Sequence, residues 1–306
     1  MKKTDFCPAL LKKADLHMHA SRSGLIRDFE KAFHCSVDHS QRKNVSSIEE
    51  MQEWVDFNIH PYVKSRQDWL KRIELMFFAC EKDNVVYAEP DFTLRDIMRF
   101  SSFDEFRNEI DQIRVRHPHI RIKPVLSFSR KWRLDNSAES IAHLFAQGWF
   151  GAIDLCNNEL LANIEMFKPL YELAEIYGLR KKAHVGEFGT ADDVLFAIKE
   201  LKLDEVQHGI ALADNVNAME EAAQYNVMFN ICPASNIHLR RINSYEEHPI
   251  GKMYKSGLKV TINTDDLLIF NSTLSEQYEK LLKAKVLNEE ELIEICNMGL
   301  KRVEET

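Results

Sequence analysis

The stretch Ala14-Asp15-Leu16-His17-Met18-His19 is a short β-rich run that ends in polar residues, and runs of this kind return seven more times along the chain. Segments with helical periodicity separate them, such as 160–177, which is closed by Gly178, and 191–201, which Thr190 precedes as a predicted N-cap. Repeated strand–helix units predict a parallel sheet. The other candidate strands are 85–92, 121–129, 151–157, 181–187, 205–210, 227–233 and 259–265.

Eight strand–helix units in 306 residues favour an α/β fold that closes into a (β/α)8 TIM barrel, with an open doubly wound sheet as the alternative. No internal repeat, low-complexity tract or linker divides the chain, so we expect a single domain over residues 1–306. The connection from 21 to 84 is unusually long and carries more than one helix, including the amphipathic run 54–80. This helical insertion after the first strand is expected at the active-site face, either as a pocket wall or lid or as an extra pair of packing helices.

The composition narrows the classes of partner. A formal charge of −8 argues against a polynucleotide or an anionic membrane as partner, because a polyanion needs a basic surface. Six scattered cysteines without a C-x-x-C pair indicate reduced thiols, and no segment has the pattern of a signal peptide or the length of a membrane span. We therefore expect a cytoplasmic protein that acts on a small molecule. A homo-oligomer stays open.

The chemistry is expected at the strand ends. His17 and His19 alternate on one strand, so both side chains point the same way and can reach one ion. His184, His208 and Asp265 come at the ends of other candidate strands, and in a barrel all these ends converge on one face. Histidine nitrogens and a carboxylate oxygen are ligands that zinc accepts, with one position left open for water in a catalytic site.

Five motifs in order along almost the whole chain identify a relationship. The sequence resembles adenosine deaminase and its relatives in the amidohydrolase superfamily. The motifs that carry the resemblance are Lys13-Ala14-Asp15-Leu16-His17-Met18-His19, His184-Val185-Gly186-Glu187, His208-Gly209, Cys232-Pro233-Ala234-Ser235-Asn236 and Asn263-Thr264-Asp265-Asp266.

The resemblance implies specific roles for these residues. Glu187 would be the proton shuttle that faces purine N1, and His208 would orient and stabilise the attacking hydroxide. Asp266 would hydrogen-bond purine N7, while its neighbour Asp265 points the other way and is both a catalytic residue and a metal ligand. The fourth strand lacks the lysine with which two-metal relatives usually bridge their ions, which favours one metal. The implied ligands of one zinc ion per chain are His17, His19, His184 and Asp265.

The implied reaction is hydrolytic removal of the 6-amino group from a purine, which leaves the inosine form and ammonia. Water attacks an aromatic carbon too slowly unless it is deprotonated, and bound zinc brings its pKa from about 15.7 to about 7. Attack pushes electrons onto N1, where Glu187 would supply a proton. For this, Glu187 must either receive a proton or have a raised pKa in a desolvated pocket.

One departure from the family bears on the substrate. Relatives that bind free adenosine follow H-x-H with an acidic stretch whose aspartate contacts the ribose 5′-hydroxyl, whereas this chain has Ser21, Arg22 and Ser23 there. These side chains offer donors to phosphate oxygens, so we favour AMP or dAMP over adenosine or deoxyadenosine. The alternative is that they are solvated loop residues. Positive charges beyond the third strand that would add to the potential are Arg130, Lys131 and Arg133.

Two further departures concern the base and the loop after the aspartate pair. Asn157 stands where the family has a glycine whose backbone N–H approaches purine N3, so its side chain would either crowd the purine or supply a new contact. Leu267 replaces the family's proline after the aspartate pair, which removes no ligand.

Three other readings compete with this one. The same metal site could deaminate free adenine or hydrolyse a cyclic amide. A catalytically silent purine-binding barrel is the second reading, although such a descendant usually loses a ligand or the proton shuttle, and this chain retains both. The unrelated zinc deaminases that act on cytidine need H-x-E followed by P-C-x-x-C, and the sequence has neither.

Overall fold

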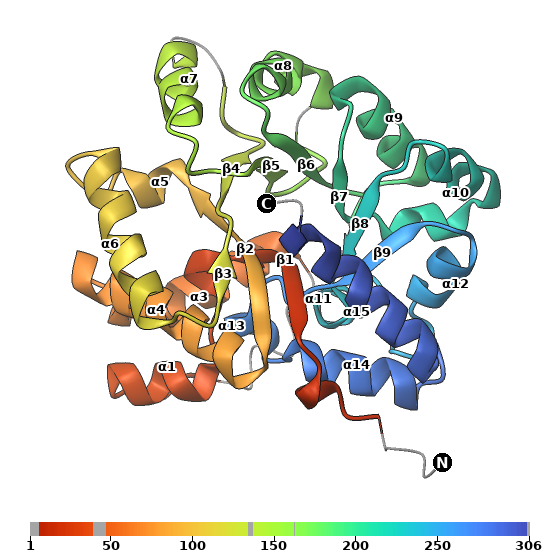
Figure 1. The fold of residues 1–306 in the computed structure, drawn as a ribbon, viewed down its shortest axis with the longest axis horizontal. Coiled ribbons are helices and arrows are strands. Elements are labelled where there is room, and N and C mark those ends of the chain that lie inside the picture. The colour runs from red at the N-terminus through yellow and green to blue at the C-terminus, as the bar shows by residue number, and fades with distance from the viewer. Residues whose placement is uncertain (1–5, 39–46, 134–136, 162, 305–306) are drawn as a thin grey trace.

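The computed structural model describes residues 6–38, 47–133, 137–161 and 163–304. Its strands form one parallel sheet with the order β1-β2-β4-β5-β6-β7-β8-β9, while the short β3 pairs with β2 beside β4. In Figure 1 the strands occupy the centre and the helices surround them. The strands are β1 (Lys13–His19), β2 (Val85–Thr93), β3 (Arg121–Ile122), β4 (Val125–Ser129), β5 (Ala152–Cys156), β6 (Arg180–Val185), β7 (Glu205–His208), β8 (Met228–Ile231) and β9 (Lys259–Ile262).

The ring closes through the segment that follows β9. Met18 and Asp265 form an isolated parallel bridge. Two hydrogen bonds form this bridge. The N–H of Asp265 donates to the carbonyl oxygen of His17 at 3.0 Å, and the N–H of His19 donates to the carbonyl oxygen of Asp265 at 3.3 Å. These two bonds connect the first and last strands, so the eight strands form a nearly closed barrel. The predicted barrel is confirmed.

The predicted strands need two corrections. The third, 121–129, is divided into β3 and β4 by Lys123 and Pro124, because proline has no N–H to donate to a ladder. Several others end earlier than predicted. The strand predicted as 205–210 stops at His208, because His208 and Gly209 have φ values of 65° and 67° and turn the chain out of the sheet.

The long connection between β1 and β2 holds α1 (Ile26–Phe33), α3 (Ile48–Asn58), the 3-10 turn η3 (His60–Tyr62) and α4 (Arg66–Lys82). The run 54–80 is shared between α3 and α4, since Pro61 interrupts it and Ser65 caps α4. Phe29 and Trp54 of the insertion are buried in one apolar cluster with Ile269 and Phe270, which follow β9. The insertion therefore lies at the carboxyl ends of the strands, as predicted.

The helices that follow the other strands cover the outside of the barrel. Helix α9 has the predicted bounds, with Thr190 and Asp193 forming a capping box. The predicted segment 160–177 is helical only from η4 (Ile164–Phe167) onward. The helices are α5 (Leu94–Ile97), α6 (Phe103–Arg116), α7 (Ala138–Ala146), α8 (Lys168–Ile176), α9 (Ala191–Leu201), η5 (Ile210–Asp214), α10 (Val216–Ala223), α11 (Pro233–His238), α12 (Ile250–Lys255), α13 (Leu267–Phe270), α14 (Leu274–Lys283) and α15 (Glu289–Glu304).

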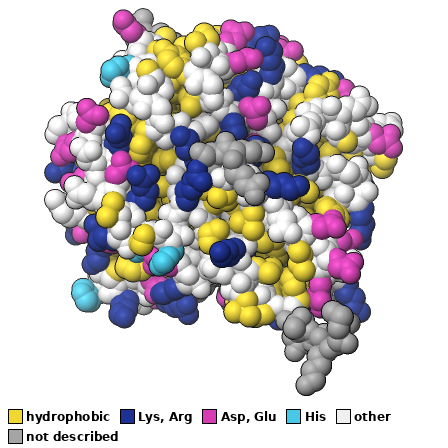
Figure 2. Space-filling view, viewed as in Figure 1, with side chains coloured by type: hydrophobic (Ala, Val, Ile, Leu, Met, Phe, Trp, Pro, Cys, Tyr) yellow, Lys and Arg dark blue, Asp and Glu magenta, His cyan; other side chains and the backbone are white. Residues whose placement is uncertain are grey.

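Helix α15 crosses the end of the barrel opposite to the insertion. Arg302, near its C-terminal end, lies 3.3 Å from the carboxylate of Glu205, the first residue of β7. The C-terminal end of α15 points toward the middle of the ring of strands in Figure 1, and Figure 2 shows Lys and Arg side chains gathered around the centre of the same face. Among the described residues, no helix combines the length and the apolar character that crossing a membrane requires.

Candidate active site

Histidines from three strands meet at one end of the barrel. His17 and His19 both lie on β1 and point to the same side of it. The ring centroids of His17 and His184 are 4.6 Å apart, and those of His19 and His184 are 5.4 Å apart. Asp265 completes the group, since its Oδ1 lies 3.6 Å from Nε2 of His17 and 3.4 Å from Nε2 of His19. The structure thus brings together the four residues that the sequence predicts as metal ligands.

Buried nitrogen atoms without a partner indicate that this cluster suits a metal ion. His17 is completely buried, and among the described residues neither of its ring nitrogens has a hydrogen-bond partner. Burial and the neighbouring His184 lower the pKa of His17 well below its usual value, so the ring is neutral and offers a lone pair. One nitrogen each from His17, His19 and His184 lies within 4.8 Å of the others, close enough to share one ion. This donor set is the one that zinc accepts.

Cys232 also lies at the cluster, although the sequence pointed to it only as part of a motif. Its Sγ is within 4.8 Å of ligand atoms of His17, His208 and Asp265. Burial and the charge of Asp265 raise the pKa of the Cys232 thiol well above its usual value. Only the thiolate binds metal well, so a thiol with a raised pKa is a weak donor until an ion displaces its proton. Burial and the charge of Asp266 raise the pKa of Asp265 itself to about 7, and a bound cation would favour its ionised form.

Two carboxylates that the sequence analysis missed form an outer layer behind the histidines. Asp154 on β5 places Oδ2 2.8 Å from Nδ1 of His184, and Asp91 on β2 places Oδ2 3.6 Å from Nδ1 of His19. Although burial opposes it, the charge of His184 lowers the pKa of Asp154, whereas burial and the charge of Asp154 raise the pKa of Asp91. Carboxylates in this position orient metal-ligating imidazoles and fix their tautomer. The sequence feature that could have indicated these two residues is an acidic side chain near the end of a buried strand.

Three non-glycine residues at strand ends adopt left-handed backbone conformations. The φ values are 79° for Asn157, 65° for His208 and 58° for Asp265. Asp and Asn tolerate this region better than most residues, and such strained positions cluster at functional sites. At each of these three positions the backbone turns away from the sheet, and the residue at the turn has a polar side chain.

Glu187 and His208 lie beside the metal cluster. Oε2 of Glu187 is 3.7 Å from Nε2 of His208, and Oδ2 of Asp265 is 3.9 Å from the same nitrogen. Burial, together with the charges of Asp265 and Glu159, raises the pKa of Glu187 well above its usual value. This bears on the alternative left open by the sequence, because a raised pKa favours the protonated form of the carboxyl.

The tautomer of His208 follows from its other nitrogen. Burial and the charge of His184 lower the pKa of His208 well below its usual value, so its ring is neutral. Nδ2 of Asn236 lies 3.2 Å from Nδ1 of His208, and Oδ1 of Asn236 lies 3.3 Å from Nε2 of the buried His248. With the Asn236 amide donating to Nδ1, the proton of the neutral ring is on Nε2, which faces Glu187 and Asp265.

The residues predicted to bind a phosphate are partly engaged within the protein. Arg22 donates through one terminal nitrogen to Oδ2 of Asp266 at 3.1 Å and through the other to Oε1 of Gln52 on α3. Ser23 is completely buried, and its hydroxyl donates to the carbonyl oxygen of His19 at 2.8 Å. Ser21 is half-buried. Arg22 therefore joins the predicted base-reading residue Asp266 to the insertion, which forms a wall of the site through Gln52.

Asn157 uses its side chain locally. It stands where relatives have glycine and has the left-handed φ that glycine adopts without strain. Its Oδ1 accepts a hydrogen bond from the backbone N–H of Asn158 at 2.8 Å. The left-handed turn is compatible with asparagine, and the contact of Asn157 with a purine stays a prediction.

The positive charges after β4 are not grouped as a free basic patch. Arg130 is buried and donates to the carbonyl oxygen of His184 at 2.6 Å. Arg133 donates to the carbonyl oxygen of Arg130 at 2.9 Å, while Lys131 is exposed. Arg130 therefore supports the backbone of a predicted metal ligand, which the sequence did not indicate.

Comparison with known proteins places the chain in a family. The family model described as "Adenosine deaminase" matches residues 37–303. A Treponema pallidum protein that is provisionally named an adenosine/adenine deaminase is 33% identical over 280 residues, which cover 90% of this chain and 93% of that protein.

Solved structures share the fold. An Arabidopsis N6-mAMP deaminase is 20% identical with a TM-score of 0.81, covering 96% of this chain and 93% of that one. An amidohydrolase from Burkholderia ambifaria with bound Zn is 22% identical with a TM-score of 0.77, covering 96% of this chain and 85% of that one. With the family model matching most of its length, the chain belongs to the adenosine deaminase family of the amidohydrolase superfamily.

Proposed function

We propose that this deaminase hydrolytically removes the 6-amino group from a purine nucleoside or nucleotide, with one zinc ion per chain. The observation that carries the proposal is the position of Glu187, a buried carboxyl with a raised pKa, beside neutral imidazoles and Asp265, which together suit a metal ion. A silent purine-binding barrel would have no need of a protonated carboxyl at this place.

Each residue has a task that follows from its surroundings. A zinc ion bound by His17, His19, His184 and Asp265 would supply the Lewis acidity that makes water a nucleophile at neutral pH. Glu187 holds a proton for purine N1, where negative charge develops, and this proton stays on N1 of the 6-oxopurine product. The ionised carboxylate can then carry a second proton, from the hydroxyl added at C6, to the departing amine.

His208 and Asp266 act on the two sides of the reacting group. The Nε2–H of His208 points toward Glu187 and Asp265, so it can hold the attacking oxygen by donating a hydrogen bond. Among the described residues, Oδ1 of the buried Asp266 has no hydrogen-bond partner. Purine N7 only accepts hydrogen bonds, so its contact with this oxygen requires a shared proton on Asp266.

A 5′-phosphorylated substrate is our finer proposal, and it depends on Arg22. A guanidinium has five N–H donors, of which Asp266 and Gln52 use one each in this structure. The Arg22 side chain is 27% exposed, so the remaining donors are within reach of a ligand. No acidic residue stands at positions 20–24 to repel a phosphate.

An absorbance assay of deamination tests both levels of the proposal. Adenosine, deoxyadenosine, AMP, dAMP and free adenine are compared at equal concentration, with Glu187→Gln as control and its zinc content measured. We expect conversion by the wild type, loss of conversion in the variant with zinc retained, and faster turnover of the monophosphates. Preference for unphosphorylated forms would remove the finer proposal, and preference for adenine would move the protein to the rival activity. Absence of conversion of all five compounds by zinc-loaded wild type would overturn the proposed function.

A further inference from the structure

We propose that Glu159 is a positioning residue for Glu187, an inference that rests on the proposed function of Glu187 as proton carrier. Glu159 lies in the loop after β5, and Glu187 lies in the loop after β6. The two residues belong to neighbouring strands of the barrel, so one loop can hold the other from the side.

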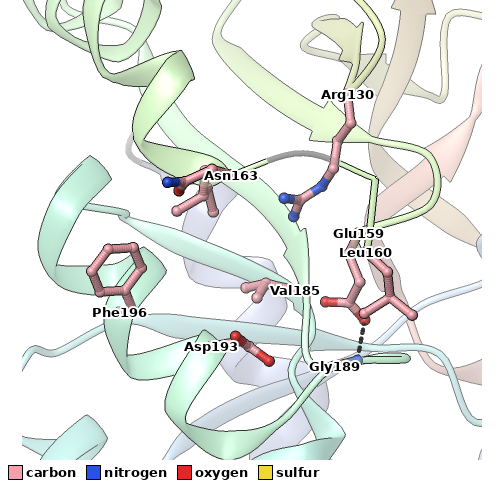
Figure 3. A pocket seen from close by; sticks show the side chains of 9 residues that line it. Arg130, Glu159, Leu160, Asn163, Val185, Gly189, Asp193 and Phe196 are labelled. Carbon is pink, nitrogen blue, oxygen red and sulfur yellow. Dashed lines mark hydrogen bonds between the residues drawn. The ribbon is translucent and has the colours of Figure 1, made fainter.

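The carboxylate of Glu159 binds the backbone on both sides of Glu187. Its Oε2 accepts from the N–H of Gly186 at 2.6 Å, and its Oε1 accepts from the N–H of Gly189 at 2.8 Å and from that of Phe188. Figure 3 shows Glu159 reaching across to Gly189, where a dashed line marks the bond. Three of the four amides of 186–189 therefore converge on one carboxylate, a concave arrangement that favours an anion.

These amides depend on Glu159 because the loop offers them no regular ladder. The carbonyl of Gly186 accepts from the N–H of Ala211, but the hydrogen bonds described for the N–H groups of Gly186, Phe188 and Gly189 all end on Glu159. Hydrogen bonds to an ionised acceptor are about twice as strong as neutral ones. Removing the carboxylate would leave the N–H groups of a tight loop to water or to other conformations.

The loop is also tightly packed at its first residue, which transmits the position of the backbone to Glu187. Gly186 has a φ of 74°, and a β-carbon there would lie 2.3 Å from Cγ2 of Val194 on α9. Arg130, Glu159 and Val185 line a cavity of about 330 Å³ on the outer side of β6, and Val185 lies near the middle of the labelled residues in Figure 3. Arg130 holds the carbonyl of His184 and Glu159 holds the amides that follow, so the two supports act on consecutive parts of one segment.

The expected consequence is a loss of rate rather than of binding. A displacement of a catalytic group by about 1 Å can lower the rate about 100-fold. In Glu159→Gln the amide nitrogen cannot accept a hydrogen bond, so at least one N–H of the loop loses its partner. We expect kcat to fall about 100-fold while KM stays within about threefold and the zinc content is unchanged.

The test compares Glu159→Gln with Glu165→Gln. Glu165 is exposed in the same connection between β5 and α8, and its carboxylate accepts from Nδ2 of the exposed Asn163 at 2.8 Å, so its variant should keep the wild-type kcat. Hydrogen exchange of a peptide covering 185–190 should be faster in Glu159→Gln and unchanged in Glu165→Gln. A wild-type kcat or unchanged exchange in Glu159→Gln would overturn the inference, as would a fall in kcat accompanied by loss of zinc.

A double variant separates positioning from a general structural effect. If Glu159 acts through Glu187, adding Glu159→Gln to Glu187→Gln should lower the remaining rate by less than about threefold, because the two changes remove one shared contribution. A further 100-fold loss in the double variant would contradict the proposed route. If the zinc-loaded wild type has no deaminase activity, the proposed function fails and this inference fails with it. An active wild type with a wild-type rate in Glu159→Gln overturns only the inference.

Discussion

The interior of the barrel contains two layers of buried polar side chains that differ in how completely they are paired. Toward the start of the strands, Glu89, Lys182 and Glu205 are completely buried and form an ion-pair network. Lys182 contacts both carboxylates, at 2.5 Å and 3.1 Å, and Arg180 bridges the same two from the edge. Asn230 donates to Glu205 at 2.7 Å, so each charged group of this layer, here called the paired layer, has a partner.

The layer at the carboxyl ends of the strands is incompletely paired. Among the described residues, both ring nitrogens of His17, Oε1 of Glu187 and Oδ1 of Asp266 are buried without a hydrogen-bond partner. Each such group costs about 1–3 kcal/mol relative to a satisfied one. We call this set, with the other predicted metal ligands, the open layer.

The difference indicates that the two layers have different roles in the barrel. A satisfied network rigidifies the scaffold, whereas unsatisfied groups persist only where a ligand completes them or where function requires the strain. Variants in the paired layer should therefore act on stability, and variants in the open layer should act on activity and metal binding.

The largest expected effect comes from Asp265→Asn in the open layer. Asparagine tolerates the left-handed φ of 58° but removes the negative charge from the ion site. We expect kcat/KM to fall on the order of 10⁴-fold. A bound ion speeds the reaction by lowering the pKa of water from about 15.7 to about 7, and the variant would lose part of this acceleration. Steady-state kinetics measure this, with the exposed Asp192→Asn as control. A wild-type rate in Asp265→Asn would remove the distinction between the layers.

Glu205→Ala addresses the paired layer. Deleting one member of a buried ion-pair network leaves uncompensated charge, so the free energy of unfolding should fall by about 3–5 kcal/mol. Urea denaturation measures the fall, and the folded variant should keep its activity within about twofold. Glu175→Ala removes an exposed partner of Lys202 and should cost less than about 1 kcal/mol. Equal losses in the two variants would show that the paired layer adds little stability.

Asp154→Asn tests the outer layer behind the ligands. The carboxylate of Asp154 lies 2.8 Å from Nδ1 of His184, and its replacement weakens the orientation of that ring. We expect zinc affinity to fall about 10- to 100-fold, measured by competition with a chromogenic chelator. Unchanged affinity would mean that His184 needs no such support.

The smallest effect is a difference in the pH dependence of stability. Although burial opposes it, Lys182 and Arg180 lower the pKa of Glu205, so this residue stabilises the fold above the unfolded pKa of about 4.3 and less as the pH falls below it. Between pH 4 and pH 3 the wild type should lose about 1 kcal/mol more than Glu205→Gln does. Urea titrations at fixed pH values compare the two. Parallel curves would contradict the depressed pKa.

The sequence was sufficient to predict the barrel and a group of metal-binding side chains at the strand ends, because both depend on local patterns. The choice of four ligands within that group came from the family resemblance. Alternation on β1 aligns His17 with His19, and parallel strands carry His184 and Asp265 to the same end. Loop contacts could not be predicted in this way. Arg22 contacts Asp266, 244 residues away, and Glu159 binds the loop of Glu187 through backbone groups that have no sequence signal.

Two polar residues have partners in the structure that the sequence did not indicate. Arg130 was predicted as a source of positive potential, yet it is buried against the carbonyl of His184. Ser23 was predicted to bind phosphate, yet its hydroxyl donates to the carbonyl of His19. In both cases a backbone oxygen of the metal-binding segments is the partner, and composition does not reveal such oxygens.

Metal analysis of the purified wild type, before and after treatment with a chelator, tests the open layer as a metal centre most directly. The account predicts one zinc per chain, loss of deaminase activity in proportion to zinc removed, and recovery when zinc is restored. Full activity in a preparation with less than about one zinc per ten chains, and no other bound divalent metal, would contradict it.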